Sequence, residues 1–231
     1  MDNSKNIWYL ENVNLYNLLC PTKEDPEARK RSRTVFKKGE FIYFPNDTSD
    51  RIFFIDEGRV KIGTYSEDGK EIIKAILQRG EVFGELAIVG EEKRTNFAQA
   101  MDDVLLCERS VEESKAMMMV EKDFSLHITK LIGEKLIKTE RRLESLIFKD
   151  ARTRIVEFLH DLALDRGEQV GYEVVVRNFF THKEIANLTG TSRQTVTTVL
   201  NELRDENLIY FDRKRLLVRD MDALNSEVNP V

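Results

Sequence analysis

Residues 181–203 read THKEIANLTGTSRQTVTTVLNEL, and this stretch decides the fold of the carboxyl-terminal part of the chain. Thr181 and Glu184 fit a capping box, in which a threonine hydroxyl accepts from the third helical N–H and a glutamate reaches back to the cap. Gly190 offers a tight turn, and residues 191–194 fit a second capping box that opens a second helix. Two short helices joined by such a turn are typical of a helix-turn-helix, whose second helix enters the DNA major groove.

The side chains expected on the outer face of the second helix suit contact with DNA. Arg193 can give two parallel hydrogen bonds to guanine, Gln194 can do the same with adenine, and hydroxyl groups meet phosphates or either base. The basic turn at residues 212–215 would form a wing beside the helix. The predicted DNA-contacting residues are Thr181, Lys183, Ser192, Arg193, Gln194, Thr197, Thr198 and Lys214. A helical hairpin with a solvated polar face is the alternative interpretation.

Length and composition limit the possible classes of protein. A chain of 231 residues fits two compact domains, and its 41% hydrophobic and 33% charged residues exclude disordered and collagen-like classes. The net charge of −5 means that any DNA binding must be local. Two cysteines cannot hold a four-cysteine metal or iron-sulfur cluster. Since neither a signal peptide nor an apolar stretch of about 18 residues is found, we expect a cytoplasmic protein that does not interact with membranes.

The distribution of glycine and of helix formers predicts the order of domains. Residues 7–19 predict a leading amphipathic helix. Residues 34–110 alternate short apolar runs with glycines, which favours an antiparallel jelly roll. Clear strands are expected at 41–44, 51–55, 60–64 and 71–77. The fold class is therefore α+β, and the predicted divisions are an effector-binding jelly roll at 1–120, a long dimerisation helix at 121–149 and a winged helix-turn-helix at 150–231.

Five residues of the long helix follow a heptad pattern. Their steps of four, three, four and three residues form a seam, and a seam needs a second copy of the helix to bury it. We therefore expect a parallel homodimer, although packing of the same stripe on the chain's own barrel is the alternative. The seam residues are Ile132, Leu136, Thr139, Leu143 and Leu146.

A glycine-containing segment in the barrel has the chemistry of a phosphate site. Gly84 and Ala87 allow close approach of a backbone, Arg94 can pair with phosphate as a fork, and Glu85 can accept from a ribose hydroxyl. Leu86 completes the first part of the motif, and Thr95 follows the arginine. The segment therefore predicts a site for a cyclic sugar phosphate. A structural turn with a surface ion pair between Glu85 and Arg94 is the alternative.

Together, the barrel motif GELA…RT, the long helix and the sequence KEIA…GTSRQTV resemble the Crp/Fnr family of bacterial transcription regulators over nearly the whole chain. The resemblance implies a homodimer on a pseudo-palindromic site in double-stranded DNA, contact with RNA polymerase, and two effector pockets whose occupancy repositions the DNA-binding heads. It implies no required cofactor, and cAMP or another cyclic nucleotide as effector. The effector-binding positions are Gly84, Glu85, Leu86, Ala87, Arg94, Thr95 and Thr139.

Several residues depart from the cyclic-AMP receptor within this family. Thr139 corresponds to a helix threonine that holds adenine across the dimer, and its alternative role is to fix helix register. Glu140 replaces a small hydroxyl residue beside it, which weakens the case for adenine. Gln194 replaces a glutamate and Thr198 replaces a base-reading arginine. We therefore expect a different DNA consensus at two positions of each half-site.

Other functions fit the sequence less well. A haem or gas sensor needs a spaced pair of ligands, and none is formed by the candidates His127, His160, His182, Cys20 and Cys107. Cys107 lies in a strand-like run and is better explained as a small core residue. A jelly-roll metalloenzyme needs histidines on its strands, and residues 34–110 contain none, so we predict no catalytic residues and no metal site. A haem, gas or metabolite effector on the same regulator scaffold, no effector at all, or a ligand-binding module without DNA function remain as alternatives.

Overall fold

The computed structural model describes residues 33–228, which form two compact units that divide inside one long helix. The first unit extends to Ile137 and the second begins at Lys138, within helix α4 (Lys122–Phe148). The predicted leading helix at residues 7–19 lies outside the described residues. No helix among residues 33–228 is long and apolar enough to cross a membrane.

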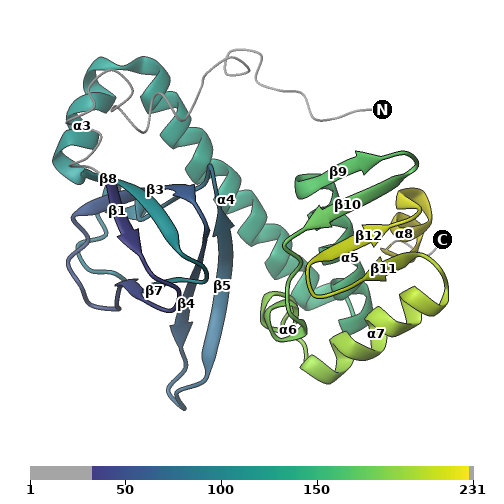
Figure 1. Cartoon of the computed structure of the whole chain (residues 1–231). Coiled ribbons are helices and arrows are strands. Elements are labelled where there is room, and N and C mark those ends of the chain that lie inside the picture. Colours follow the sequence, from purple (N-terminus) through teal and green to yellow (C-terminus); the bar gives the residue numbers. More distant parts are fainter. Residues whose placement is uncertain (1–32, 229–231) are drawn as a thin grey trace. The chain divides into compact units, whose positions relative to one another are not determined.

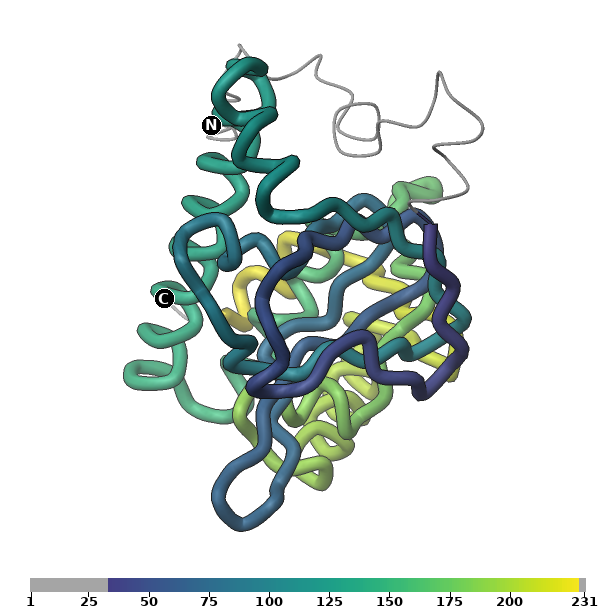
Figure 2. The backbone as a smooth tube through the Cα atoms, turned by 90° about the vertical axis from the view of Figure 1, so that its left-hand side faces the viewer, coloured from purple at the N-terminus to yellow at the C-terminus, as the bar shows by residue number. Residues whose placement is uncertain are grey.

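The first unit is a barrel of two antiparallel four-stranded sheets, as the glycine-punctuated pattern predicts (Figure 1). One sheet has the order β1-β8-β3-β6 and the other has the order β2-β7-β4-β5. The hairpin of β4 and β5 extends beyond the other strands (Figure 1 and Figure 2). The strands are β1 (Arg33–Phe36), β2 (Phe41–Tyr43), β3 (Arg51–Glu57), β4 (Arg59–Tyr65), β5 (Glu71–Gln78), β6 (Val82–Phe83), β7 (Phe97–Ala100) and β8 (Val104–Ser110). The four strands predicted most clearly are confirmed.

Strand β3 is buried on both faces, and its side chains alternate between two cores. Phe53 and Ile55 belong to the cluster that also contains residues of the second sheet. Ile52 and Phe54 point the other way and pack with Phe124 of α4. A strand with apolar residues in both registers is therefore needed here, because one face meets the second sheet and the other meets helix side chains.

Helix α3 (Val111–Val120) begins at a capping box in which Ser110 accepts from the N–H of Glu113, and α4 follows. The first turns of α4 pack on the barrel, since Phe124 and Ile128 are each 1% exposed. Ile132 is partly buried against the same cluster. The first residue of the predicted seam therefore contributes to the chain's own core, as the alternative interpretation of the stripe expected.

Cys107 of β8 is 3% exposed and belongs to the cluster under the helices. Its position in the core agrees with the prediction. It is disulfide-bonded, however, and so is not the simple core thiol that the sequence suggested.

The second unit combines a four-stranded antiparallel sheet with four helices that follow α4. Its sheet has the order β11-β12-β10-β9, and β11 and β12 pair as a hairpin around the predicted basic turn at residues 212–215. Strand β9 and helix α8 were not predicted: GEQV has a single apolar residue, and the Asp220 side chain that accepts from the N–H of Ala223 at the start of α8 was missed. The elements are α5 (Ala151–Arg166), β9 (Gly167–Val170), β10 (Glu173–Arg177), α6 (His182–Thr189), α7 (Arg193–Asp205), β11 (Ile209–Phe211), β12 (Arg215–Val218) and α8 (Met221–Val228).

Helix α5 supports the turn between α6 and α7. The guanidinium of Arg154 donates to the carbonyl of Thr189 at 2.9 Å and to that of Gly190 at 3.2 Å. A third bond joins it to the carbonyl of Lys149 at 2.7 Å. Carbonyl groups at a helix end lack intrahelical partners, so a single arginine satisfies them and fixes the direction in which α7 starts.

Candidate functional site

Gly84 lies at the entrance to a short 3-10 helix, η2 (Glu85–Ala87), with φ of 77°. A side chain would be strained in this left-handed conformation. A Cβ atom would also lie 2.9 Å from the carbonyl oxygen of Arg51 and 3.1 Å from Nη1 of Arg94. The backbone at this position can therefore approach its neighbours only because the residue is glycine.

Arg94 is a buried cation at the centre of the predicted phosphate site. It is 3% exposed, and its Nη1 donates to the carbonyl oxygen of Gly84 at 3.2 Å while Nη2 donates to that of Arg51. Its guanidinium carbon lies 4.6 Å from the ring centroid of Tyr43. Burial raises the pKa of the Tyr43 phenol, so the ring stays neutral under the cation. Nε of Arg94 is buried and has no hydrogen-bond partner among residues 33–228.

The carboxylate of Glu91 faces the groups that the motif offers to a phosphate. Oε1 accepts from the hydroxyl of Thr95 at 2.9 Å and from its N–H at 3.3 Å. Oε2 accepts from the hydroxyl of Ser49 at 3.0 Å and lies 3.7 Å from Nη1 of Arg94. Glu91 was not predicted from the sequence, although its spacing of three and four residues from Arg94 and Thr95 was a usable signal.

Glu85 is 5% exposed and pairs with a lysine from α4. Nζ of Lys135 lies 2.9 Å from Oε1 of Glu85 and also donates to the carbonyl of Val82 at 2.9 Å. The alternative of a surface ion pair between Glu85 and Arg94 is therefore wrong: both residues are buried, and each has a different charged partner. No local pattern predicted Lys135, because it is distant in sequence.

The remaining residues of the predicted effector set differ in burial. Ala87 is 4% exposed and Leu86 is 40% exposed. Thr95 is exposed and bonded to Glu91, and Thr139 is an exposed residue of α4 within the second unit. The structure thus brings Gly84 and Arg94 into direct contact, and joins Thr95 to Arg94 through Glu91.

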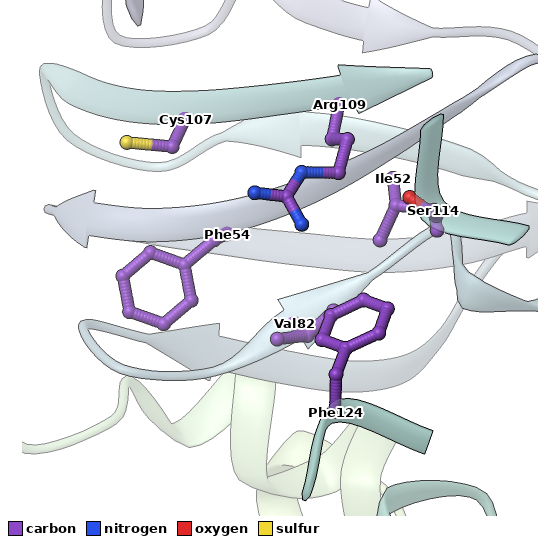
Figure 3. A pocket seen from close by; sticks show the side chains of 7 residues that line it. All are labelled: Ile52, Phe54, Val82, Cys107, Arg109, Ser114 and Phe124. Atoms are coloured by element: carbon purple, nitrogen blue, oxygen red, sulfur yellow. The ribbon is translucent and has the colours of Figure 1, made fainter. Parts of the chain in front are cut away.

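A separate small pocket lies in the cluster between β-strands and the helices (Figure 3). Arg109 of β8 extends into it, with its guanidinium carbon 5.6 Å from the ring centroid of Phe124. Burial lowers the pKa of Arg109 from its ordinary value. The lining residues are Ile52, Phe54, Val82, Cys107, Arg109, Ser114 and Phe124. None of them belongs to the predicted effector set.

The helix pair in the second unit begins as predicted at Thr181. Its hydroxyl accepts from the N–H of Glu184 at 3.3 Å, and the Glu184 carboxylate accepts from the N–H of Thr181 at 2.7 Å. Gly190 ends α6 in the left-handed conformation, with φ of 63°. The second capping box is wrong: Ser192 caps α7 by accepting from the N–H of Thr195 at 3.0 Å, and Gln194 takes no part in the cap.

Three of the predicted DNA-contacting side chains stand free at the start of α7. Arg193, Gln194 and Thr198 are exposed, and within residues 33–228 their side chains form no hydrogen bond or ion pair. The inward stripe of the same helix is fully packed, since Val196, Leu200 and Leu203 are each 0% exposed. The helix therefore presents unpaired polar groups on one side because its other side is anchored; the further buried residue of the stripe is Val199.

Two other predicted contact residues are already engaged within the protein. The hydroxyl of Thr197 donates to the carbonyl of Arg193 at 2.9 Å and lies 2.8 Å from Nδ1 of His182. Burial, and then the charge of Arg193, lower the pKa of His182. Ser192 is the helix cap described above. Thr181 and Lys183 are exposed at the start of α6.

The predicted wing is a tight turn organised by one carboxylate. Oδ1 of Asp212 accepts from the N–H groups of Lys214 at 2.7 Å and Arg215 at 3.0 Å, and Oδ2 lies 3.1 Å from Nε of Arg215. These hydrogen bonds, that of Lys214 first, lower the pKa of Asp212. The side chains of Arg213 and Lys214 are exposed at the tip.

Comparison with known proteins places two family models on these two regions. The cyclic nucleotide-binding domain matches residues 33–120, and the Crp-like helix-turn-helix domain matches residues 153–227. The first match contains the whole of the barrel site around Arg94. The second contains α6, α7 and the basic turn.

Several characterised relatives match most of the chain. A global nitrogen regulator of Synechocystis sp. is 30% identical over 194 residues, which is 83% of this chain and 86% of that protein. A CRP-like cAMP-activated global transcriptional regulator of Mycobacterium tuberculosis is 29% identical over 189 residues, covering 82% of this chain and 84% of the relative. Among solved structures, a CooA mutant from Carboxydothermus hydrogenoformans has a TM-score of 0.79 and 28% identity, and covers 95% of this chain and 98% of its own.

Proposed function

The chain belongs to the Crp/Fnr family of DNA-binding transcription regulators, and on that premise we propose that it acts as a cytoplasmic homodimer gated by a small anionic effector in the barrel. The effector class that the barrel motif favours is a cyclic nucleotide. The proposed target is a pseudo-palindromic site in double-stranded DNA, where the bound dimer would meet RNA polymerase.

The exposed start of α7 supports sequence-specific contact with DNA. Arg193 and Gln194 have planar groups that can give paired hydrogen bonds to a purine edge, and neither is engaged within residues 33–228. Thr198 lies one turn further along. Lys183, Lys214 and Arg213 suit phosphates, which position a protein on DNA without reading its sequence. Ser192 caps α7 and Thr197 lies within hydrogen-bond distance of His182, so both help to position the start of α7.

The exposed stripe of α4 supports the homodimer. Leu136 and Leu143 are each 58% exposed and Leu146 is 45% exposed, although each is a large apolar side chain. Burial of a leucine is worth about 1.5–3 kcal/mol, so a row of them in solvent favours pairing with a second copy. Thr139 would be the polar member of this seam, where it sets helix register or contacts the effector.

One observation carries the effector proposal: Arg94 is buried, its Nε has no partner in the described part of the chain, and it lies beside position 84, where a Cβ atom would clash. An unsatisfied buried donor is costly, and an acceptor oxygen from a ligand would remove that cost. A phosphate is the acceptor that a buried guanidinium binds best. Gly84, Glu85, Leu86, Ala87, Thr95 and Thr139 complete the proposed site.

Calorimetric titration of the purified, nucleotide-stripped dimer with cAMP and cGMP tests this proposal. We expect saturable binding that is lost in Arg94→Ala. Because Arg94 is buried, Arg94→Lys and a thermal melt serve as controls for folding. If both nucleotides fail to bind while the protein remains folded and retains DNA, the cyclic-nucleotide effector is excluded and the DNA-binding function stands.

Selection of bound sequences from a random DNA pool tests the proposed base contacts. We expect half-sites that differ at two positions from those of the cyclic-AMP receptor, because each bidentate contact carries about 1–3 kcal/mol of discrimination. Recovery of an unchanged consensus would exclude base reading by Gln194 and Thr198.

A further inference from the structure

The barrel site contains an internal carboxylate that is placed as a ligand phosphate would be. Glu91 is only 12% exposed at its side chain and receives three hydrogen bonds, two from Thr95 and one from the buried Ser49. Its second oxygen also faces the Arg94 guanidinium at 3.7 Å. The groups proposed to hold an effector phosphate are therefore already directed at the carboxylate of Glu91, which is negatively charged as a phosphate is.

The position of Glu91 is fixed from its backbone outward. Its N–H donates to the carbonyl of Leu86 at 3.0 Å, which ties the residue to the end of the short 3-10 helix. The carboxylate then spans two segments of the barrel, since Ser49 precedes β3 and Thr95 precedes β7. The Glu91 side chain can therefore leave this position only if its hydrogen bonds from Ser49 and Thr95 are all broken.

We propose that Glu91 sets the affinity of the barrel site for phosphate esters, because its carboxylate acts as an internal competitor of the effector phosphate. This inference rests on the proposed effector function. A cyclic nucleotide carries one negative charge on its phosphate, and it has to displace the Glu91 carboxylate from Thr95 and accept its repulsion near Arg94. The wild-type chain consequently binds cyclic nucleotides more weakly than the donor set alone allows.

The unpaired Nε of Arg94 explains why the site keeps a capacity for anions despite this competitor. Glu91 approaches the guanidinium from the side of Nη1, and no acceptor within residues 33–228 reaches Nε. A phosphate has more acceptor oxygens than a carboxylate and can satisfy this donor as well. The phosphate and the carboxylate are therefore close competitors, and the charge of one side chain decides the affinity.

Titration of the full-length chain with cAMP and cGMP, comparing Glu91→Gln with wild type, tests the inference. The amide oxygen of glutamine can still accept from Thr95, so the loop keeps its fold while the charge is removed. We expect at least tenfold tighter binding of one or both nucleotides. Glu92→Gln is the matched control, because Glu92 is the exposed neighbour of the same charge, with no ion pair within residues 33–228; we expect less than a twofold change.

Each outcome bears on one of the two proposals. Tighter binding in Glu91→Gln supports the inference, even if wild type binds neither nucleotide and the proposed effector is wrong for the natural chain. Equal or weaker binding in Glu91→Gln, with binding by wild type, overturns the inference and leaves the proposed function standing. Absence of binding in every variant overturns both. If Glu91→Gln has a lower melting temperature than wild type, Glu91→Ala replaces it in this test, since alanine also removes the charge.

Discussion

The barrel site and the start of α7 use polar side chains in opposite ways. In the barrel, Arg94 is 3% exposed and Glu85 is 5% exposed, and both have charged partners from the protein itself. At the start of α7, Arg193 and Gln194 are exposed and have no such partners among residues 33–228. A ligand for the barrel must therefore exchange contacts that already exist, whereas DNA meets exposed side chains that give up no hydrogen bond or ion pair within residues 33–228.

This difference separates stability from binding at the two sites. A buried charge with several partners belongs to the folded structure, so its removal leaves other groups unsatisfied. An exposed charge without partners contributes little to folding, and its removal is felt only when the ligand is present. The following substitutions test that separation.

The largest effect is expected for Arg94→Ala on the stability of the barrel. The substitution removes hydrogen bonds to the carbonyls of Gly84 and Arg51 and leaves Glu91 without its cation. We expect the free energy of unfolding to fall by about 3 kcal/mol. Chemical denaturation measures it, with Arg193→Ala as the control that stays within about 0.5 kcal/mol of wild type. Equal stability of the two variants would contradict the comparison.

Arg193→Ala is expected to show the reverse pattern. Loss of a bidentate base contact costs about 1–3 kcal/mol, so affinity for the selected DNA site falls roughly 5- to 150-fold while the melting temperature is unchanged. Fluorescence anisotropy with selected and scrambled duplexes measures the effect. Arg79→Ala, an exposed arginine of the barrel, is the charge-matched control. A similar loss in the control would mean that net charge, and not base reading, governs binding.

A smaller effect is expected at the cap of α7. Ser192 accepts from the N–H of Thr195, so Ser192→Ala should lower the free energy of unfolding of the second unit by about 1 kcal/mol. Thr191→Ala is the comparison, since Thr191 is not the cap and its hydroxyl lies 2.9 Å from that of Thr189. A larger loss in Thr191→Ala would mean that Thr191, the residue that the sequence pattern favoured, is the cap of α7.

The smallest effect concerns the pH dependence of stability. Burial lowers the pKa of His182 in the folded chain, whereas the unfolded chain titrates near 6.5. The unfolded state then binds more protons, so the free energy of unfolding falls as the pH drops through about 6.5. Urea unfolding at pH 7.5 and 5.5 measures this decrease, and His182→Gln should reduce it. An unchanged decrease in that variant would assign it to other groups.

Local patterns predicted the fold well because the decisive signals are local. The capping box at Thr181, the turn at Gly190 and the short apolar run of β3 each act within a few residues, and all three appear in the structure. The prediction failed for the second cap, because Thr191 and Ser192 both have suitable hydroxyls and only the backbone conformation distinguishes them. Helix α8 had a signal that was missed, since Asp220 accepts from the N–H of Ala223.

The candidate barrel site was predicted in its members but not in its pairing. Gly84 and Arg94 contact each other as the motif implies. The partner of Glu85 comes from α4, and no spacing rule links Lys135 to a barrel residue so distant in sequence. Partners of this kind follow from tertiary packing of the first turns of α4, which depends on Phe124 and Ile128 and not on the motif itself.

The ion pair between Lys135 and Glu85 joins helix α4 to the short 3-10 helix of the barrel site. Lys135 and Leu136 are consecutive on α4, about 100° apart around the helix axis, so one is bonded to the barrel while the next is 58% exposed. A molecule that binds Glu85 in place of Lys135 would remove one of the bonds that hold α4 against the barrel, while the bond from Lys135 to the carbonyl of Val82 would remain. The barrel carboxylate and the exposed apolar stripe thus meet on one helix, at two consecutive residues.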